Sequence, residues 1–228
     1  MPITDPASQE FADIGDLRMT LTEEGCRACD LGFQEGLNGV CVARGLASSR
    51  RMIIGEAPGK HEDAQSEPFV GPAGQLLNKV LESVGFNPDT DFYVTNVVLC
   101  RPIAPKGSGK ENYTPRMVQR RRCRPFLEQQ IGLIQPRIIV TLGKPATEAI
   151  LGVSGIRMGD YRGKMQRNVA ILQHSEEGTL IGRPYVFPML HPAAILHARS
   201  QPEKHQLYRE QTWEDIKHLK QFIEENDL

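Results

Sequence analysis

Four of the five cysteines have a spacing that suits a metal or an iron–sulfur centre. Cys26 and Cys29 form a C-x2-C pair, while Cys100 and Cys123 follow much later in the chain. Four thiolates are a complete ligand set for zinc or for a [4Fe–4S] cluster. Zinc modules usually draw on two closely placed pairs, so the wide separation of the second pair favours the cluster. The alternative is that these cysteines are small buried apolar residues, which is the favoured interpretation for Cys41.

The N-terminal residues and the cysteine count indicate a reducing compartment. The segment 1–23 is interrupted by proline and aspartate and contains no apolar core of a signal peptide. No apolar run approaches the roughly 20 residues that a membrane span needs. Because an odd number of cysteines in such a chain argues against a disulfide framework, we expect a cytoplasmic protein with no membrane association.

A turn rich in glycine and proline follows the first expected strand. Its sequence, GEAPGK at residues 55–60, is one residue too short for the phosphate-binding motif G-x4-G-K, and His61 replaces the required Ser or Thr. No G-x-G-x-x-G follows any expected strand, so we expect no nucleotide cofactor. The turn presents Glu56 and then Glu62, with Phe69 beyond them. An acidic solvated loop with Phe69 in the core is the alternative.

Positive charge is concentrated in one stretch, although the net charge of the chain is only −1. Arginines crowd one expected helix and two lysines precede it, namely Arg116, Arg120, Arg121, Arg122, Arg124, Lys106 and Lys110. Such a cluster suits nucleic-acid phosphates, because a local basic surface is sufficient for binding. The alternatives are a solvated cationic helix face and arginines that balance an anionic cluster.

These residues need a scaffold, and the apolar pattern predicts one. Short apolar runs indicate strands at 51–55, 92–98, 137–142 and 184–190, and helical spacing indicates helices at about 72–84, 115–134, 144–151 and 204–225. This alternation predicts an α/β fold with a mostly parallel sheet between helices. We expect a partly disordered N-terminal tail at 1–20 and a single domain at 21–228.

Ligands of such sheets bind beyond the carboxyl ends of the strands. Three expected strands end in unusual sequences: the GEAPG turn after the first, Asn96 within the second, and His191 with Pro192 after the last. We therefore expect these three segments to converge on one pocket.

Four motifs, in this order, resemble the family 4 uracil-DNA glycosylases: GEAPGKHEDAQSEPFVGPAGQLL (55–77), NVVLCRP (96–102), CRPFLEQQI (123–131) and HPAAIL (191–196). The resemblance runs from Cys26 to about Ile216. It implies a three-layer α/β/α sandwich and a [4Fe–4S] cluster held by Cys26, Cys29, Cys100 and Cys123. It also implies a DNA repair enzyme that flips uracil out of single- or double-stranded DNA and hydrolyses its N-glycosidic bond, leaving an abasic site. We expect a monomer.

The resemblance also implies roles for individual residues. Phe69 stacks on the flipped uracil. The side-chain amide of Asn96 donates to O4 and accepts from N3–H of uracil, and cytosine has the opposite order of donor and acceptor at these two positions. His191 donates a hydrogen bond to the uracil O2 as negative charge develops there. Glu56 positions the water or counters the positive charge of the sugar, with Glu62 in support.

Other parts of the motifs are expected to meet the substrate. Ala57, where the classical branch has aspartate, and Gly59 lie on the turn that contacts the base. Ile195 is either a wedge that fills the gap left by the flipped base or a core residue. The expected DNA contacts also include Arg116, Arg120 and Lys110.

Three features depart from the family pattern. Ser66 and Glu67 replace a glycine-containing approach to Phe69, and His197 stands where arginine is common. The loop 103–113 is longer than the family norm. A related branch with an extended basic loop becomes covalently trapped on DNA through a histidine, whereas this loop offers Asn112, so we expect turnover.

Two other functions fit parts of the same pattern. A non-catalytic or redox-sensing iron–sulfur DNA-binding protein would keep the cluster and the basic helix. A glycosylase for another deaminated base, such as hypoxanthine or xanthine, would keep the hydrolytic groups in a different base pocket.

Overall fold

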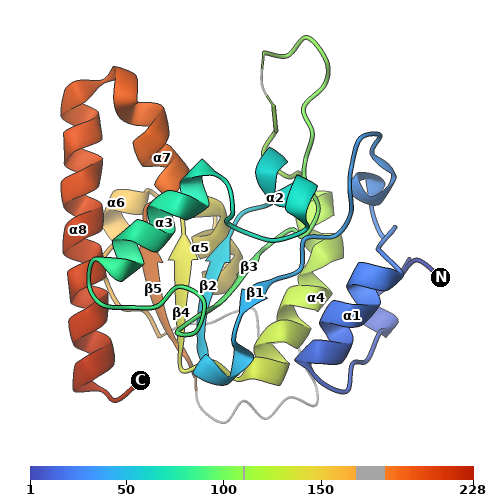
Figure 1. The fold of residues 1–228 in the computed structure, drawn as a ribbon, viewed down its shortest axis with the longest axis horizontal. Helices are drawn as coiled ribbons and strands as arrows, with labels where there is room; N and C mark the ends of the chain where they lie inside the picture. Colours follow the sequence, from blue (N-terminus) through green and yellow to red (C-terminus); the bar gives the residue numbers. More distant parts are fainter. Residues whose placement is uncertain (110, 168–182) are drawn as a thin grey trace.

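The computed structural model describes residues 1–109, 111–167 and 183–228. At the centre of this part of the chain is a five-stranded sheet in the order β1-β3-β2-β4-β5 (Figure 1). The strands are β1 (Arg44–Gly45), β2 (Arg51–Gly55), β3 (Tyr93–Asn96), β4 (Ile138–Leu142) and β5 (Tyr185–Met189). Neighbours pair in parallel except for the edge strand β1, which is antiparallel to β3. The predicted α/β class is confirmed.

Both faces of the sheet are buried. Successive strand residues point to opposite faces, so in β2 Met52 and Ile54 enter one apolar cluster while Ile53 enters the other. Strand β4 alternates in the same way, with Ile139 on the first face and Ile138 on the second. These side chains are fully buried. Continuously apolar strands of this kind are typical of a parallel sheet covered on both sides.

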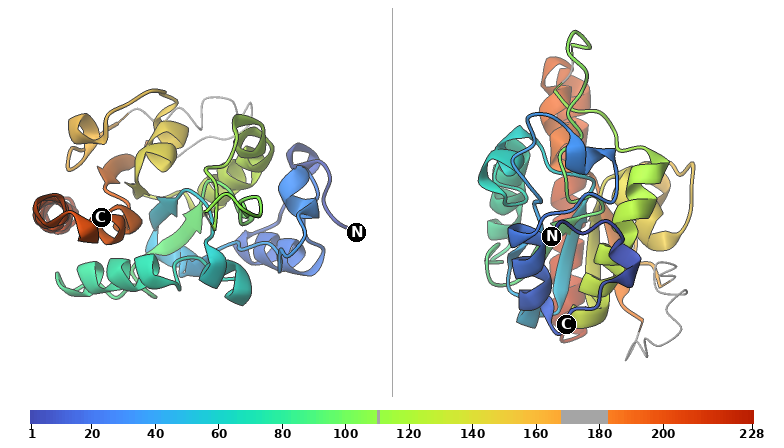
Figure 2. Two further views of the ribbon diagram at one scale, coloured as in Figure 1. Left: turned by 90° about the horizontal axis from the view of Figure 1, so that it is seen from above. Right: turned by 90° about the vertical axis from the view of Figure 1, so that its right-hand side faces the viewer.

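Helices form the two outer layers. They are α1 (Ile14–Glu23), α2 (Lys60–Gln65), α3 (Pro72–Glu82), α4 (Met117–Ile134), α5 (Lys144–Leu151), α6 (Met158–Tyr161), α7 (Pro192–His197) and α8 (Pro202–Glu225), with short 3-10 segments that include η2 (Asp30–Phe33) and η5 (Ala198–Ser200). Helices α1, α4 and α5 contribute to the first apolar cluster, and α3 and α8 to the second. Figure 2 shows the sheet between these layers, which confirms the three-layer sandwich.

The N-terminal segment differs from the tail expected at 1–20. Helix α1 falls partly within that range and buries Leu17 and Leu21 completely. Asp13, which reads as an interruption in the sequence, is the N-cap of this helix, because its carboxylate accepts the backbone N–H of Asp16 at 2.9 Å. An aspartate at this position satisfies one of the free N–H groups of the first turn, so it begins a helix here.

None of the helices in the described part of the chain combines the length and the apolar character that crossing a bilayer requires. The two longest helices, α4 and α8, both carry charged residues along their length.

Candidate active site

A cavity of about 450 Å³ lies beyond the carboxyl ends of β2, β3 and β5. The turn after β2, the end of β3, the loop before α4 and the start of α7 form its walls. Its lining residues are Glu56, Ala57, Pro58, Gly59, Glu62, Phe69, Ala73, Asn96, Pro102, Asn112, Tyr113, Thr114, Pro115, His191, Ala193, Ala194 and His197. The three strand ends therefore meet at one cavity, as their sequences predict.

Phe69 is held in this cavity by an unusual backbone conformation and by two glycines. Its φ of 59° lies in the left-handed region, which a bulky residue rarely adopts. A Cβ on Gly74 would lie 1.7 Å from the carbonyl oxygen of Phe69, and a Cβ on Gly55 would lie 2.6 Å from its ring. Only glycine at both positions lets the ring lie over the end of β2. Strained positions of this kind are concentrated at functional sites.

Asn96 stands beside Phe69 because of the strand register. It is the last residue of β3 and pairs with Gly55, the last residue of β2. A Cβ on Gly55 would lie 2.4 Å from the amide oxygen of Asn96. The same glycine thus makes room for both the ring and the amide, and Asn96 is only 2% exposed at the base of the cavity.

His191 is a neutral imidazole with a defined tautomer. It caps α7, and its Nδ1 accepts the backbone N–H of Ala193 at 3.1 Å. Burial is the larger cause that lowers its pKa, the neighbouring His197 acts in the same direction, and together they bring the pKa to about 4. Since Nδ1 is an acceptor, Nε2 carries the hydrogen and is a donor. The ring centroid lies 5.8 Å from that of Phe69, so two rings border the cavity.

Glu56 presents a carboxylate oxygen that lacks a hydrogen-bond partner within the described part of the chain. This atom, Oε1, is buried, and Nη2 of Arg120 lies 3.8 Å away. Burial raises the pKa of Glu56, whereas Arg120 and a hydrogen bond from Thr114 act in the opposite direction. A buried acceptor of this kind beside a cavity is suited to binding a water molecule.

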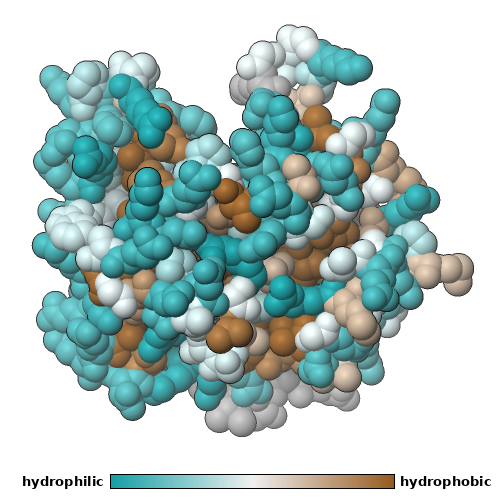
Figure 3. All heavy atoms as spheres, in the orientation of Figure 1, coloured by the Kyte–Doolittle hydropathy of each residue, from teal (hydrophilic) through white to brown (hydrophobic). Residues whose placement is uncertain are grey.

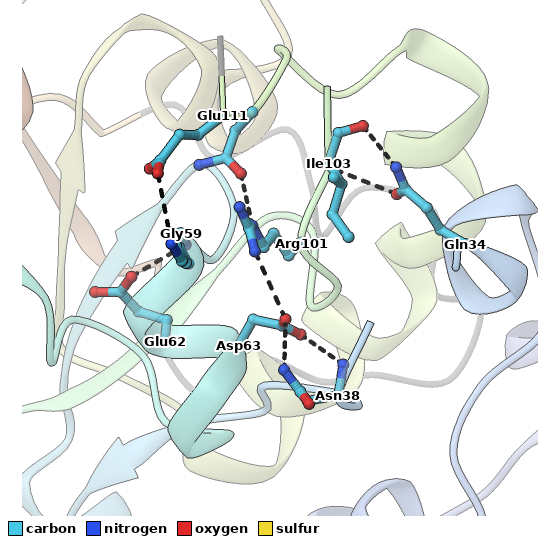
Figure 4. A network of polar contacts seen from close by, with 10 residues as sticks. Gln34, Asn38, Gly59, Glu62, Asp63, Arg101, Ile103 and Glu111 are labelled. Carbon is cyan, nitrogen blue, oxygen red and sulfur yellow. Dashed lines mark hydrogen bonds and ion pairs between the residues drawn. The ribbon is translucent and has the colours of Figure 1, made fainter. Parts of the chain in front are cut away.

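Glu62 braces the turn that carries Glu56. Its two oxygens accept the backbone N–H groups of Gly59 at 3.1 Å and Gly71 at 2.7 Å. Figure 4 shows Glu62 beside Gly59 at the start of α2. A Cβ on either glycine would come within 3 Å of the carboxylate, so glycine is needed for this close approach. Because both oxygens are occupied, Glu62 holds the wall of the cavity in shape.

The extended loop 103–113 is anchored at both ends (Figure 4). Gln34 exchanges two hydrogen bonds with the backbone of Ile103, at 2.6 and 3.2 Å. Arg101 donates to the side-chain oxygen of Asn112 at 2.7 Å and lies 3.9 Å from the buried carboxylate of Asp63. These contacts bring Asn112 to the cavity, where it lines the wall.

The four cysteines predicted as ligands line a second, small cavity beside η2 and α4, namely Cys26, Cys29, Cys100 and Cys123. Cys41 is buried outside it. Within the described residues no group of three ligands is placed to hold a single metal ion. Backbone N–H groups approach two sulfurs, Ala28 to Cys26 at 3.5 Å and Leu99 to Cys123 at 3.4 Å. Sulfur ligands of iron–sulfur clusters accept such bonds, so the thiol set fits a cluster.

The residues predicted to contact DNA are placed differently from one another. Arg116 is exposed and forms an ion pair with Asp30. Arg120 is instead turned inward, toward Glu56. Ile195 is only 3% exposed and does not line this cavity; it lines another cavity on the other side of α7. Lys110 lies outside the described residues.

Sequence reasoning missed several residues of the cavity wall. Tyr113 and Thr114 line it from the loop before α4, and Ala193, Ala194 and His197 line it from α7. The turn-forming sequence before Pro115 and the helical spacing after His191 are the signals that could have found them.

Comparisons with known proteins show the family to which this chain belongs. Residues 43–217 match the model of the uracil DNA glycosylase superfamily, and the chain belongs to this superfamily. Among its curated relatives are type-4 uracil-DNA glycosylases. The protein of Thermotoga maritima is 32% identical over 198 residues, covering 87% of this chain and 89% of the relative. That of Sulfurisphaera tokodaii is 35% identical over 173 residues, covering 75% and 71%. That of Pyrobaculum aerophilum is 43% identical over 116 residues, covering 50% and 55%.

Proposed function

We propose that this protein excises uracil from DNA by hydrolysing the N-glycosidic bond, leaving an abasic site. The observation that carries this proposal is that Phe69, Asn96, His191 and Glu56, from four separate segments, line one cavity. Family membership supports the same reaction, because the type-4 relatives are uracil-DNA glycosylases. In this function the cavity receives a single base that has left the helical stack.

Recognition of the base rests on Phe69 and Asn96. Extrusion of a base costs a few kcal/mol of stacking and pairing, and stacking on the Phe69 ring returns about 1–3 kcal/mol. The Asn96 amide donates to the uracil O4 and accepts from N3–H. Cytosine presents a donor and an acceptor in the opposite order, so it would leave buried polar groups unpaired. The pair therefore selects uracil over cytosine.

His191 stabilises the negative charge of the departing uracil. Its neutral ring donates from Nε2 to O2, because Nδ1 is occupied by the N–H of Ala193. Donors that are oriented before the reaction do not need to reorganise as charge develops, and one such donor is worth roughly 10²–10³ in rate.

Glu56 orients the attacking water and faces the positive charge that develops on the sugar. Its buried Oε1, which lacks a hydrogen-bond partner among the described residues, is the water acceptor. Glu62 is a positioning residue, since its carboxylate is engaged by Gly59 and Gly71. Ala57 and Gly59 form the part of the wall that contacts the base.

The four cysteines of the small cavity hold a [4Fe–4S] cluster. The cluster supplies a covalent link between the N-terminal segment and α4, and it takes no part in hydrolysis. Burial raises the pKa of Cys26, Cys100 and Cys123, and the positive charge of iron favours their thiolate forms. Phosphate contacts come from Arg116 and from the exposed Arg121 on α4. The protein acts as a cytoplasmic monomer without a nucleotide cofactor.

Purified protein incubated with uracil-containing oligonucleotides tests this function. Single strands and duplexes with U opposite G, together with matched strands containing thymine, hypoxanthine or xanthine, are treated with alkali, which cleaves abasic sites. Cleavage at uracil and not at thymine is the expected result. Cleavage only at hypoxanthine or xanthine would indicate a different lesion. DNA binding with no cleavage at any of these bases would indicate a non-catalytic protein.

A further inference from the structure

Another large cavity, which we call the groove, lies on the other side of α7 from the candidate active site. It has a volume of about 600 Å³ and lies between α3, α8 and the α7–η5 segment. Ala193 and His197 line the candidate active site, whereas Leu196 and Arg199 line the groove. The two cavities are therefore separated by roughly the thickness of one helix, about 10–12 Å with side chains.

The floor of this groove is apolar and includes the single tryptophan of the chain. Trp213 is 44% exposed, and Val80 and Leu196 lie in the same lining. Lys217 lies over the ring, with Nζ 4.7 Å from a ring centroid. Figure 3 shows hydrophobic atoms in the hollow at upper left, beside α8, bordered by hydrophilic atoms. An exposed aromatic ring in a hollow offers a stacking surface for another planar group.

The rim of the groove carries more positive than negative charge. Lys79, Arg199 and Arg209 line it, and none of the three forms an ion pair within the described part of the chain. Glu210 also lines it, and its carboxylate accepts a hydrogen bond from Gln206 at 2.6 Å. Cations around an aromatic surface are the combination that binds single-stranded nucleic acid.

We propose that this groove binds a nucleotide of the substrate strand about three positions away from the uracil. The inference rests on the proposed function, because it needs the uracil to occupy the candidate active site. Stacked nucleotides are spaced by about 3.4 Å along a strand, so a strand that crosses the thickness of α7 advances by about three nucleotides. The base stacks on Trp213, and its flanking phosphates contact Arg199 and Arg209.

A length series of single-stranded oligonucleotides tests this placement. Each carries a hydrolysis-resistant 2′-fluoro-deoxyuridine, and the strand is shortened one nucleotide at a time from the 5′ side or from the 3′ side. The dissociation constant of the wild type should rise when the strand on one particular side of the uracil becomes shorter than about three nucleotides. The rise should be at least about fivefold, which corresponds to the lower limit of the free energy of one base stack. Truncation on the other side should show no step at that length.

The variants Trp213→Leu and Arg209→Gln identify the groove as the origin of this step. Trp213→Leu keeps an apolar side chain and removes the ring, so its affinity for the long oligonucleotide should fall toward that of the wild type for the short one, with the phosphate contacts of Arg199 and Arg209 retained. Arg209→Gln should reduce the salt dependence by about 0.7 in slope. Leu207→Ala, an exposed apolar residue of α8 outside the groove, and Lys220→Gln are the matched controls.

Excision of unmodified uracil from the shortest oligonucleotide separates the two proposals. Trp213→Leu should excise uracil from it at the wild-type rate, because that substrate does not reach the groove. Absence of excision by the wild type from both the long and the shortest oligonucleotide would refute the proposed function. Excision by the wild type with no length step, or with a step that Trp213→Leu retains, would refute the groove as a nucleotide site.

Discussion

Arg120 on α4 and Glu56 on the turn after β2 face each other, with 3.8 Å between Nη2 and Oε1. Arg120 is fixed in place by a hydrogen bond from its Nε to the carbonyl of Pro115 at 3.0 Å. Its side chain is only 21% exposed, and that of Glu56 is 28% exposed. This arginine was expected to contact phosphates, yet its position makes it the cation that opposes the effect of burial on Glu56.

The first prediction concerns the acid limb of the activity profile. Burial raises the pKa of Glu56 and Arg120 lowers it, so Arg120→Met should raise this pKa further. Since the reaction needs the ionised carboxylate, the acid limb of kcat should move to higher pH, with activity recovering as the pH rises. A pH profile of single-turnover rates measures the shift. Arg120→Lys should restore most of the profile, and an unchanged profile in Arg120→Met would contradict this role.

The second prediction concerns the protonation of His191. With a pKa of about 4, the imidazole should stay neutral from pH 5.5 to 8. The nitrogen chemical shifts of labelled protein should show hydrogen on Nε2 and no titration over this range. His191→Gln should reduce kcat by roughly 10²–10³ with little change in DNA binding. Titration of the His191 ring near pH 6.5 would disprove its role as a neutral donor.

The third prediction concerns the space above the end of β2. Gly55→Ala places a methyl group 2.6 Å from the Phe69 ring and 2.4 Å from the Asn96 amide, so uracil binding should be lost while the fold remains. Gly132→Ala on α4 is the matched control, because nothing lies within 4 Å of its added Cβ. The control should be more stable by about 0.5–1 kcal/mol. Equal affinity of both variants for uracil-containing DNA would contradict the role of Gly55.

The fourth prediction concerns the contribution of Glu62 to stability as the brace of the turn. Glu62→Ala removes the acceptor of two backbone N–H groups, which should lower the free energy of unfolding by about 1–3 kcal/mol. Urea denaturation measures this loss. Glu111→Gln removes only an exposed contact with Lys60 at 3.9 Å, so it should change stability by less than about 1 kcal/mol. Wild-type stability in Glu62→Ala would show that the brace is unimportant.

The fifth prediction distinguishes the cluster ligands from the remaining cysteine. Cys123→Ser should lose visible absorption and bound iron, since it removes a thiolate of the small cavity. Cys41→Ser should keep both, because Cys41 lies outside that cavity. Iron and zinc analysis with an absorption spectrum decides between the centres. A colourless wild type that contains zinc would contradict the cluster.

The central strands and the residues at their ends could be predicted from the sequence. A short apolar run such as 51–55 is strong evidence of a buried strand, and glycine or histidine at its end marks the site edge. Helix α1 was missed because Asp13 is equally compatible with a loop and with an N-cap. Only a packing partner for Leu17 and Leu21 decides between them, and that partner is distant in the sequence.

Side-chain direction is the part that the sequence could not supply. Arg116 is the N-cap of α4 and Arg120 lies in its first turn, yet one is exposed beside Asp30 and the other lies beside Glu56. Their identical chemistry gave no sign of this division. Ile195 was similarly open to two interpretations, and its burial depends on how α7 packs against α3 and α8.

The most direct test of the shared cavity is the rate of uracil excision by Asn96→Asp under single-turnover conditions. The substitution keeps the size of the side chain and replaces the amide donor with a carboxylate oxygen that faces the uracil O4. If Asn96 reads the flipped base beside Phe69 and His191, excision should slow by at least about 10², with the thermal stability of the protein retained. A folded Asn96→Asp variant that excises uracil at the wild-type rate would contradict the account.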